Sequence, residues 1–359
     1  MLPRLYENNL TQASDFVTNG LGSLSDAISV SVHDVLNGEF ELVMKYPASG
    51  LHASDIVTKR IIEAAVGENS SGVPLAQPFR IYKVQKSMDG QMLTVNAHHI
   101  SYDLSGHPVA KFTATGISNI LTALGTNTLV TSPYTYSTDI TNTTSTFTLD
   151  APRSARACLG GMEGSILQQF KCEYKFDYFV VYVLARRGTD TNITIRYGVD
   201  LESFVSVKSE EASYNGVLAF WKNEGTVVSS DIQYASGANF PTDKIFILDA
   251  SSEYDSQPTK ATLNSRASAY ITANNIGVPY LETVTISFIP LWQTEEYRDV
   301  VPLEHAVMGD KVKIVYEGVE YYLRVVETTY DSLLERYTSI VLGNKKSTFS
   351  ETIKQVVKE

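Results

Sequence analysis

Two hairpin patterns near the start of the chain constrain its fold more than any other feature of the sequence. Apolar and polar residues alternate over 28–35, which is the period of a strand with one buried face. Asn37-Gly38 is a strong two-residue turn signal, and the alternation returns over 39–46. A second hairpin covers 79–97 and turns at Asp89-Gly90. Short strands joined by tight turns predict a small β-barrel or sandwich.

The pattern changes after residue 105. Apolar residues at helical spacing predict a helix over 117–124, and another is expected to start near Pro152 and to break at Gly160-Gly161. Ten threonines fall within 126–148, which is typical of exposed strands or of an ordered surface arm. Residues 172–184 have the composition of a strand.

The second half of the chain returns to a β pattern around one clear helix. Residues 258–274 predict that helix, with Asn274-Asn275 as its stop, and strand patterns continue over 283–342. Residues 55–66 are compatible with a short helix or with a turn-rich crossover. The last residues, with Ile353, Val356 and Val357, predict a terminal helix.

At 359 residues the chain exceeds what one core usually fills, so two or more domains are expected. The patterns predict a β-rich α+β protein of five segments. These segments are a first β-barrel domain (1–105), an α/β domain with the Thr-rich segment (106–185), a second β-barrel domain (186–235 and 280–345), a helical insertion (236–279) and a C-terminal tail helix (346–359).

The sequences of the two β-rich ends of the chain can be aligned with each other. Arg80 and Arg324 each follow an apolar or aromatic residue, and Thr94 and Thr338 each lie fourteen residues further on. Both spans carry an Asp followed by a small residue in their connection. Hairpins of this length also match by chance, so an internal duplication and a coincidence both stay open.

Charge and composition exclude several classes of function. The formal net charge is −11, and the basic residues are scattered, whereas gripping a phosphate backbone requires clustered Lys and Arg. The longest apolar run, 179–185, is far too short to span a bilayer, and the N-terminus lacks the pattern of a signal peptide. Cys158 and Cys172 are expected to be reduced, partly buried thiols. Synthesis in a cytoplasm, without membrane insertion, is therefore expected.

His98-His99 is the most tempting pair for chemistry. Adjacent residues of a strand point to opposite faces, so the two imidazoles cannot easily share one metal, and a packing or hydrogen-bonding role is favoured. The other candidate catalytic or ligand-binding residues form weaker patterns, because they are adjacent or isolated, or because they lack the partner residues that catalysis or ligand binding would need. They are His305 with Glu304 and Asp310, the glycine-rich stretch 160–164, Glu210-Glu211 and Glu295-Glu296. We therefore expect no catalytic residue, no metal and no cofactor.

Several stretches, taken in order along the chain, resemble the prophage tail protein family, whose members are also labelled prophage endopeptidase tail or tail-associated lysin. They include Ala97-His98-His99-Ile100, Arg186-Arg187-Gly188 and Met308-Gly309-Asp310-Lys311. The remaining stretches are 36–42, 77–82, 101–104, 197–198, 279–297, 312–314, 323–331 and 336–344.

The resemblance implies a fold like the central hub of phage baseplates, with two related antiparallel β-barrels that alternate with smaller α/β segments. It also implies a non-enzymatic hub in the virion tail, assembled in the host cytoplasm as a homotrimer. Such a hub would connect the tail tube or a distal tail protein to the tip or receptor-binding proteins. Three acidic chains around a lumen would discourage DNA from adhering as it passes.

Two other functions stay open. A cell-wall hydrolase or endopeptidase is implied by the family label alone, and the hydrolase region of long members is expected to be missing because the sequence stops at Glu359. A module that binds host-surface carbohydrate is the second alternative, since many of the 21 tyrosines fall in predicted strands, where they suit sugar stacking or protein interfaces.

Overall fold

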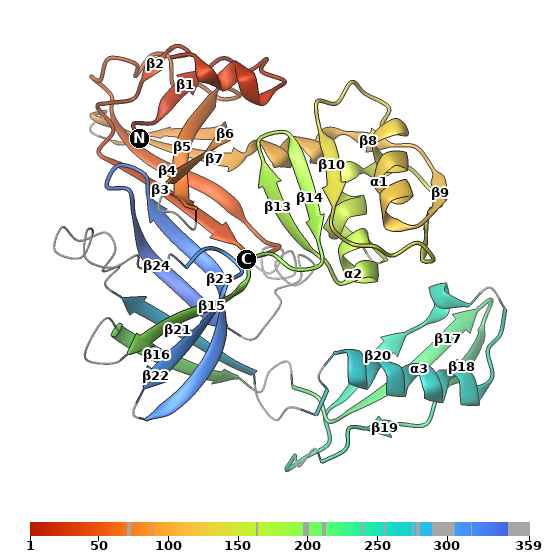
Figure 1. The fold of residues 1–359 in the computed structure, drawn as a ribbon. Helices are drawn as coiled ribbons and strands as arrows, with labels where there is room; N and C mark the ends of the chain where they lie inside the picture. Colours follow the sequence, from red (N-terminus) through yellow and green to blue (C-terminus); the bar gives the residue numbers. More distant parts are fainter. Residues whose placement is uncertain are drawn as a thin grey trace. The chain divides into compact units, whose positions relative to one another are not determined.

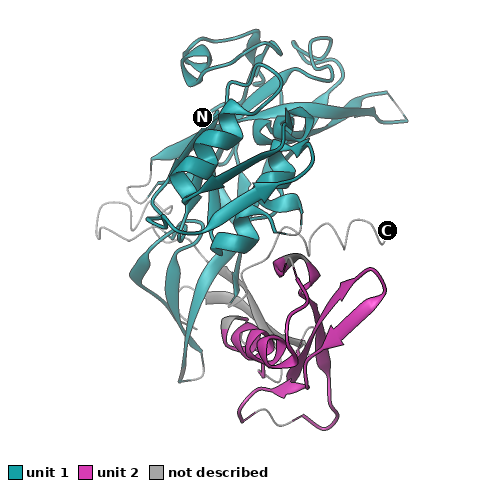
Figure 2. Cartoon of the chain, turned by 90° about the vertical axis from the view of Figure 1, so that its right-hand side faces the viewer, with its two compact units in different colours: residues 1–204, 285–359 teal, residues 205–284 magenta. Residues whose placement is uncertain are grey.

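The fold was analysed in a computed structural model of the chain. It describes residues 1–69, 73–88, 90–162, 164–196, 201–209, 213–237, 240–254, 256–274, 276–277, 281–288, 306–316 and 318–343. The chain divides into two compact units, one formed by residues 1–204 with 285–359 and the other by residues 205–284 (Figure 2). The predicted terminal helix at 346–359 lies outside the described residues. The predicted division into five segments stays a prediction.

Strands from both ends of the chain join in one 13-stranded sheet that curls into a half-barrel (Figure 1). The hydrogen-bonded order is β16-β21-β24-β23-β3-β4-β7-β6-β5-β1-β2, and β15 and β22 extend it beside β23. The strands are β1 (Arg4–Tyr6), β2 (Gly22–Ser23), β3 (Ser29–Val35), β4 (Phe40–Pro47), β5 (Ile61–Glu68), β6 (Pro74–Lys86), β7 (Met92–His99), β15 (Asp190–Arg196), β16 (Leu201–Ser209), β21 (Leu281–Phe288), β22 (Lys311–Tyr316), β23 (Val319–Asp331) and β24 (Arg336–Gly343).

The two predicted N-terminal hairpins are confirmed as β3–β4 and β6–β7. Alternate residues of these strands are buried, as their period-2 pattern predicts, and Val32, Leu42 and Val95 are at most 1% exposed. Asn37 adopts the left-handed conformation at the first turn, with φ 59°. The hairpins therefore follow directly from the local sequence.

Of the two alternatives for 55–66, the short helix is wrong, because residues 55–60 form turns and irregular backbone and residues 61–66 belong to strand β5. Ile61 packs in a core beneath the α/β layer, whereas its neighbour Ile62 packs in the core of the β-sheet. Both faces of β5 are thus covered, so its apolar residues do not alternate with polar ones. A short apolar run of this kind cannot be told from a helix by periodicity alone.

An α/β layer packs against the first hairpins (Figure 1). Its elements are η2 (Ile100–Gly106), β8 (Pro108–Val109), β9 (Phe112–Thr115), α1 (Ile117–Thr126), β10 (Thr135–Thr138), β11 (Thr146–Leu149), β12 (Arg153–Ser154), η3 (Ala157–Gly161), α2 (Ile166–Phe170), β13 (Glu173–Asp177) and β14 (Val180–Leu184), and η1 (Ala13–Val17) lies near the N-terminus. The helix over 117–124 is confirmed as α1.

Two details of this layer differ from the sequence-based prediction. The segment after Pro152 forms β12 before its helical turn, and the turn ends at Gly161, after which α2 resumes. Residues 172–184 form two antiparallel strands, not one, because Tyr178 takes a left-handed conformation with φ 48° between them. A non-glycine residue in that conformation leaves no compositional signal for the turn.

The Thr-rich segment contributes the exposed strands that its composition predicts. In β11, Phe147 and Leu149 are buried while Thr146 and Thr148 face solvent. The Thr146 hydroxyl lies 2.9 Å from that of Thr115 across the β9–β11 pair. Threonine therefore supplies the outer face of this small sheet, where β-branched polar side chains pair well.

The second compact unit consists of a small sheet and one helix. It contains β17 (Gly216–Asn223), β18 (Thr226–Ser229), β19 (Gln233–Tyr234), β20 (Ile245–Asp249), η4 (Ser251–Glu253) and α3 (Lys260–Ala273). The helix predicted over 258–274 is confirmed as α3, which Thr259 caps by accepting the N–H of Thr262 at 3.1 Å. Leu263 and Ala267 pack on Trp221 and its neighbours.

The strand order supports an internal duplication. A first module runs β3-β4-β7-β6-β5-β1 across the sheet, and a second runs β16-β21-β24-β23-β22-β15. When the strands of each module are numbered in chain order, both modules read 2-3-6-5-4-1 across the sheet. Elements β17 to α3 are inserted between β16 and β21, where the first module has the Asn37-Gly38 turn. The outermost strands differ, since β1 is antiparallel to β5 and β15 is parallel to β22.

Local geometry around the two matched arginines is the same in both modules. The β6–β7 register shifts just after Ile81, and the β23–β24 register shifts just after Val325, one residue beyond each arginine. Ile81 exchanges backbone hydrogen bonds of 2.7 and 2.9 Å with residues 59 and 60, as Val325 does at 2.9 Å with residues 309 and 310. Coincidence would not reproduce a bulge and its bonds at the same place, so the duplication is the better explanation.

Asn37 offers a test of how the first turn is built. Its side chain accepts the N–H of Tyr174 at 2.8 Å and donates to the carbonyl of Cys172, so it ties the turn to the start of β13. We expect Asn37→Ala to lower the free energy of unfolding by about 2–3 kcal/mol, because it strains the left-handed turn and leaves a buried N–H unpaired. Asn37→Gly keeps the turn and is expected to lose about 1 kcal/mol less. Urea denaturation measures both, and equal losses would contradict a role for the turn conformation.

Candidate functional site

His98 and His99 end strand β7 and point to opposite faces of the sheet. The His98 side chain is 28% exposed, whereas His99 is fully buried. The strand period predicts this separation, and it excludes a metal site made by the two neighbouring imidazoles.

His99 is a neutral core residue. Its Nδ1 accepts the N–H of Ser101 at 3.1 Å, so the proton lies on Nε2, which donates to Oε1 of Gln77 at 3.2 Å. Its ring stacks on Phe40 with 4.6 Å between centroids. Burial, reinforced by the nearby charges of Arg156 and Arg187, lowers the pKa of His99 to about 3. His99 therefore packs and hydrogen-bonds as a neutral ring at physiological pH.

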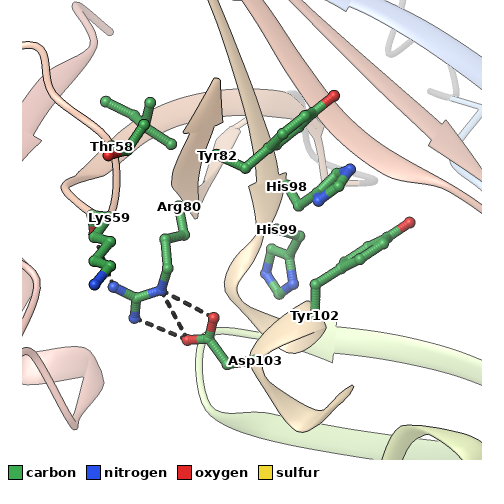
Figure 3. A pocket seen from close by; sticks show the side chains of 9 residues that line it. Thr58, Lys59, Arg80, Tyr82, His98, His99, Tyr102 and Asp103 are labelled. Atoms are coloured by element: carbon green, nitrogen blue, oxygen red, sulfur yellow. Dashed lines mark hydrogen bonds and ion pairs between the residues drawn. The ribbon is translucent and has the colours of Figure 1, made fainter. Parts of the chain in front are cut away.

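His98 lies in a stack of planar side chains on the outer face of the first module (Figure 3). Its ring centroid is 4.0 Å from that of Tyr82 on β6 and 4.3 Å from that of Tyr102 on η2. The guanidinium of Arg156 covers the Tyr102 ring at 3.8 Å. On β4, the Glu41 carboxylate lies 2.6 Å from Nε2 of His98. Side chains from three elements, β4, β6 and η2, thus contact one imidazole, and Arg156 extends the stack beyond Tyr102.

A cleft of about 470 Å³ opens beside this stack (Figure 3). Arg80 crosses it and donates three hydrogen bonds to the Asp103 carboxylate, two from Nε at 2.9 and 3.0 Å and one from Nη2 at 2.8 Å. The same guanidinium donates to the carbonyl of Lys59 at 2.8 Å. The residues that line the cleft are Thr58, Lys59, Arg80, Ile81, Tyr82, His98, His99, Tyr102 and Asp103.

The arrangement favours recognition or packing over bond cleavage. Arg80 is paired with Asp103 and His98 with Glu41, so each of these two bases is engaged with a carboxylate. Tyr82 remains 45% exposed and can stack against a planar group or a ring. The sequence analysis placed Tyr82, Tyr102 and Asp103 in family-like stretches but gave them no role beside His98, and it missed Arg156, which only the fold brings to this stack.

The second module carries the counterpart of the Arg80 site. Arg324 donates to both oxygens of the Glu173 carboxylate, at 2.8 and 2.9 Å, and to the carbonyl of Gly309 at 3.0 Å. Glu173 is fully buried, and it also accepts the N–H of Arg187 at 2.7 Å. This ion pair therefore joins the α/β layer to the second module in the interior of the protein.

Two of the family-like motifs meet at this second site. Gly188 and Gly309 have φ 76° and 90°. A Cβ added to Gly188 would lie 2.3 Å from the carbonyl carbon of Gly309, so the two backbones touch where no side chain fits. Asp310 accepts the N–H groups of Thr189 and Val307 at 2.7 and 3.0 Å. These motifs join the start of β15 to the start of β22 within the second module, and Asp310 is a structural residue here.

The remaining candidates among the described residues do not join either arginine site. Cys158 and Cys172 are buried thiols that form no disulfide, and burial raises the pKa of Cys158 to about 11. Gly160 and Gly161 end the helical turn η3. The other candidates lie outside the described residues, namely Glu163, Glu210, Glu211, Glu295, Glu296, Glu304 and His305.

In the described part of the chain, no group of three or more His, Cys, Asp or Glu side chains is arranged to hold a metal ion. A search of the same residues finds no helix long and apolar enough to cross a membrane.

No protein-family profile matches this sequence, and no curated protein matches it. Solved structures do. The tail protein of Neisseria meningitidis MC58 is 10% identical, with a TM-score of 0.61 over 98% of both chains. Prophage tail protein gp18 of Listeria monocytogenes EGD-e is 11% identical, with a TM-score of 0.58 over 100% of this chain and 99% of the other. The chain has the fold of prophage tail proteins.

A third structure extends the likeness. The 43 kDa tail protein of prophage MuSo2 from Shewanella oneidensis is 10% identical and has a TM-score of 0.60, over 89% of this chain and 95% of the other. The predicted resemblance to prophage tail proteins is confirmed at the level of the fold, as is a β-rich architecture with two related β modules. Because the sequence identity to these proteins is only 10–11%, the resemblance was visible in the sequence only as several short stretches.

Proposed function

We propose that this chain is a structural hub of a bacteriophage or prophage tail. The observation that carries the proposal is the likeness of fold to two tail proteins, one of them from a prophage, over nearly the whole length of both chains. Hub proteins need rigid modules that repeat around an axis, and the internal duplication supplies two such modules per chain. The hub would connect the tail tube or a distal tail protein to tip or receptor-binding proteins in the virion.

The proposed assembly is a homotrimeric ring through which DNA passes. Three duplicated chains present six similar modules, which suits a partner of six-fold symmetry. Each chain has a formal net charge of −11, so like-charge repulsion would keep DNA from adhering to an acidic lumen. The proposal assigns no catalytic step to the chain.

Light scattering on the purified chain, alone and mixed with the tail-tube protein of the same phage, tests the assembly. We expect a species of three chains of 39.6 kDa each, or about 119 kDa, in at least one of these samples. A persistent monomer in both would overturn the ring. In a parallel assay the chain is incubated with host cell walls, and a fall in turbidity would support the hydrolase alternative instead.

A further inference from the structure

Strand β23 changes its partner halfway along. Its first half pairs with β22, and after the bulge Glu327 to Asp331 pair with β3. The carbonyl of Val326 accepts the N–H of Leu36 at 2.9 Å, and Ser332 donates to the carbonyl of Val30 at 2.8 Å. The backbone N–H and C=O groups of the even-numbered residues in this half therefore point towards β3. Through this pairing the two modules of one chain share a single sheet.

The equivalent half of β6 has no such partner in the described part of the chain. Residues 83–86 pair with β7 just as the second half of β23 pairs with β24. On the other side of β6, however, the pairing with β5 ends at Arg80. Ser87 donates to the carbonyl of Met92, so the N–H groups of Val84 and Lys86 point to the opposite, open side. Side-chain burial agrees, since Lys86 is exposed whereas its counterpart Tyr330 is fully buried.

The second module has a complementary open edge. The strand order makes β16 the counterpart of β3, and β16 ends the sheet with β21 as its one neighbour among the described strands. Val205 in this strand is 52% exposed. Among the described strands, β6 and β16 thus each have an open edge, and their counterparts, β23 and β3, are paired with each other inside the same chain.

We infer that these edges pair between copies, so that residues 83–87 of β6 in one chain add to β16 of the next. The inference rests on the proposed trimeric ring and names the interface that closes it. The contact is head-to-tail, repeats the β23–β3 junction, and would give six modules joined by alternating internal and intermolecular junctions. Lys83 and Lys86 discourage indiscriminate strand addition to the free edge until a partner covers it.

Lys86→Pro tests the interface with little cost to the fold, because the Lys86 N–H points away from β7 and proline is tolerated on an edge. We expect its mass to fall from three chains to one, with an unchanged circular dichroism spectrum. Lys86→Ala keeps the backbone N–H and is expected to remain trimeric. Light scattering over a concentration series measures all three proteins.

Hydrogen exchange on the unmodified chain gives a second measurement that does not depend on a variant. The amides of Val84 and Lys86 are expected to exchange at least about tenfold more slowly in the trimer than after dilution to monomer, since interstrand bonds to β16 would protect them. A Lys86→Pro protein that stays trimeric, or a wild-type trimer in which these two amides remain unprotected, would overturn the interface while leaving the ring in place. A wild-type chain that never trimerises would overturn the ring itself.

Discussion

Glu173→Gln is expected to lower the free energy of unfolding by about 3–5 kcal/mol. The substitution keeps the shape of the side chain but removes a fully buried carboxylate that holds the Arg324 guanidinium through two hydrogen bonds. Arg324 is only 19% exposed, so it would retain an uncompensated charge in a poorly solvated place. At 2–4 °C per kcal/mol, the melting temperature should fall by about 10 °C.

The first module supplies a matched control for this prediction. Asp103 holds Arg80 as Glu173 holds Arg324, but the two side chains of that pair are 26% and 24% exposed. Water screens the remaining charge there, so Asp103→Asn is expected to cost about 1 kcal/mol or less. Urea denaturation at pH 7 compares the two variants. Equal losses would show that burial does not decide the strength of the junction.

Acid is expected to destabilise the protein through His99. Its pKa is about 3 in the folded chain and about 6.5 when it is unfolded, so the unfolded state binds the extra proton between these values. Stability is therefore full above about pH 6.5 and falls by about 1.4 kcal/mol per pH unit down to about pH 3 from this residue alone. The physical cause is the burial of a ring whose Nδ1 already accepts the Ser101 N–H.

His99→Asn isolates this contribution to the pH dependence. Its amide oxygen can replace Nδ1 as an acceptor, and it does not titrate, so the variant should be less stable at pH 7 but lose less stability per pH unit below 6. His98→Asn leaves the buried ring in place and is expected to retain the slope. Denaturation curves collected from pH 7 to pH 4 give these slopes, and an unchanged slope in His99→Asn would contradict the assignment.

The local sequence correctly predicted the elements that have one buried face and one solvated face. The alternation in β3 and β4, the Asn37-Gly38 turn, and helix α3 with its Asn274 stop all appear where they were expected. In each of them one face is buried and the other solvated, so the period of the apolar residues reports the backbone conformation. Strand β5 and the β13–β14 turn gave no such signal, because both faces of β5 are covered and Tyr178 is an ordinary residue in a left-handed turn.

The candidate site was predictable only in part. His98-His99 stood out by residue type, and strand geometry separated their roles correctly. Tyr102 follows His98 by four residues, but the other partners of His98, Glu41 on β4 and Tyr82 on β6, are distant in the chain, and no spacing rule connects them to it. Likewise, the glycines of the 188 and 309 motifs are explained only by the contact of their two backbones.

By itself the sequence determined the acidic charge, the hairpins, the main helices and the ordered stretches that resemble prophage tail proteins. These properties depend on residues that are near one another along the chain, or on sums over the whole of it. Tertiary structure decided the rest. The shared sheet, the common bulge beside Arg80 and Arg324, and the open edges of β6 and β16 arise from strand pairing between distant segments, which local sequence patterns do not encode.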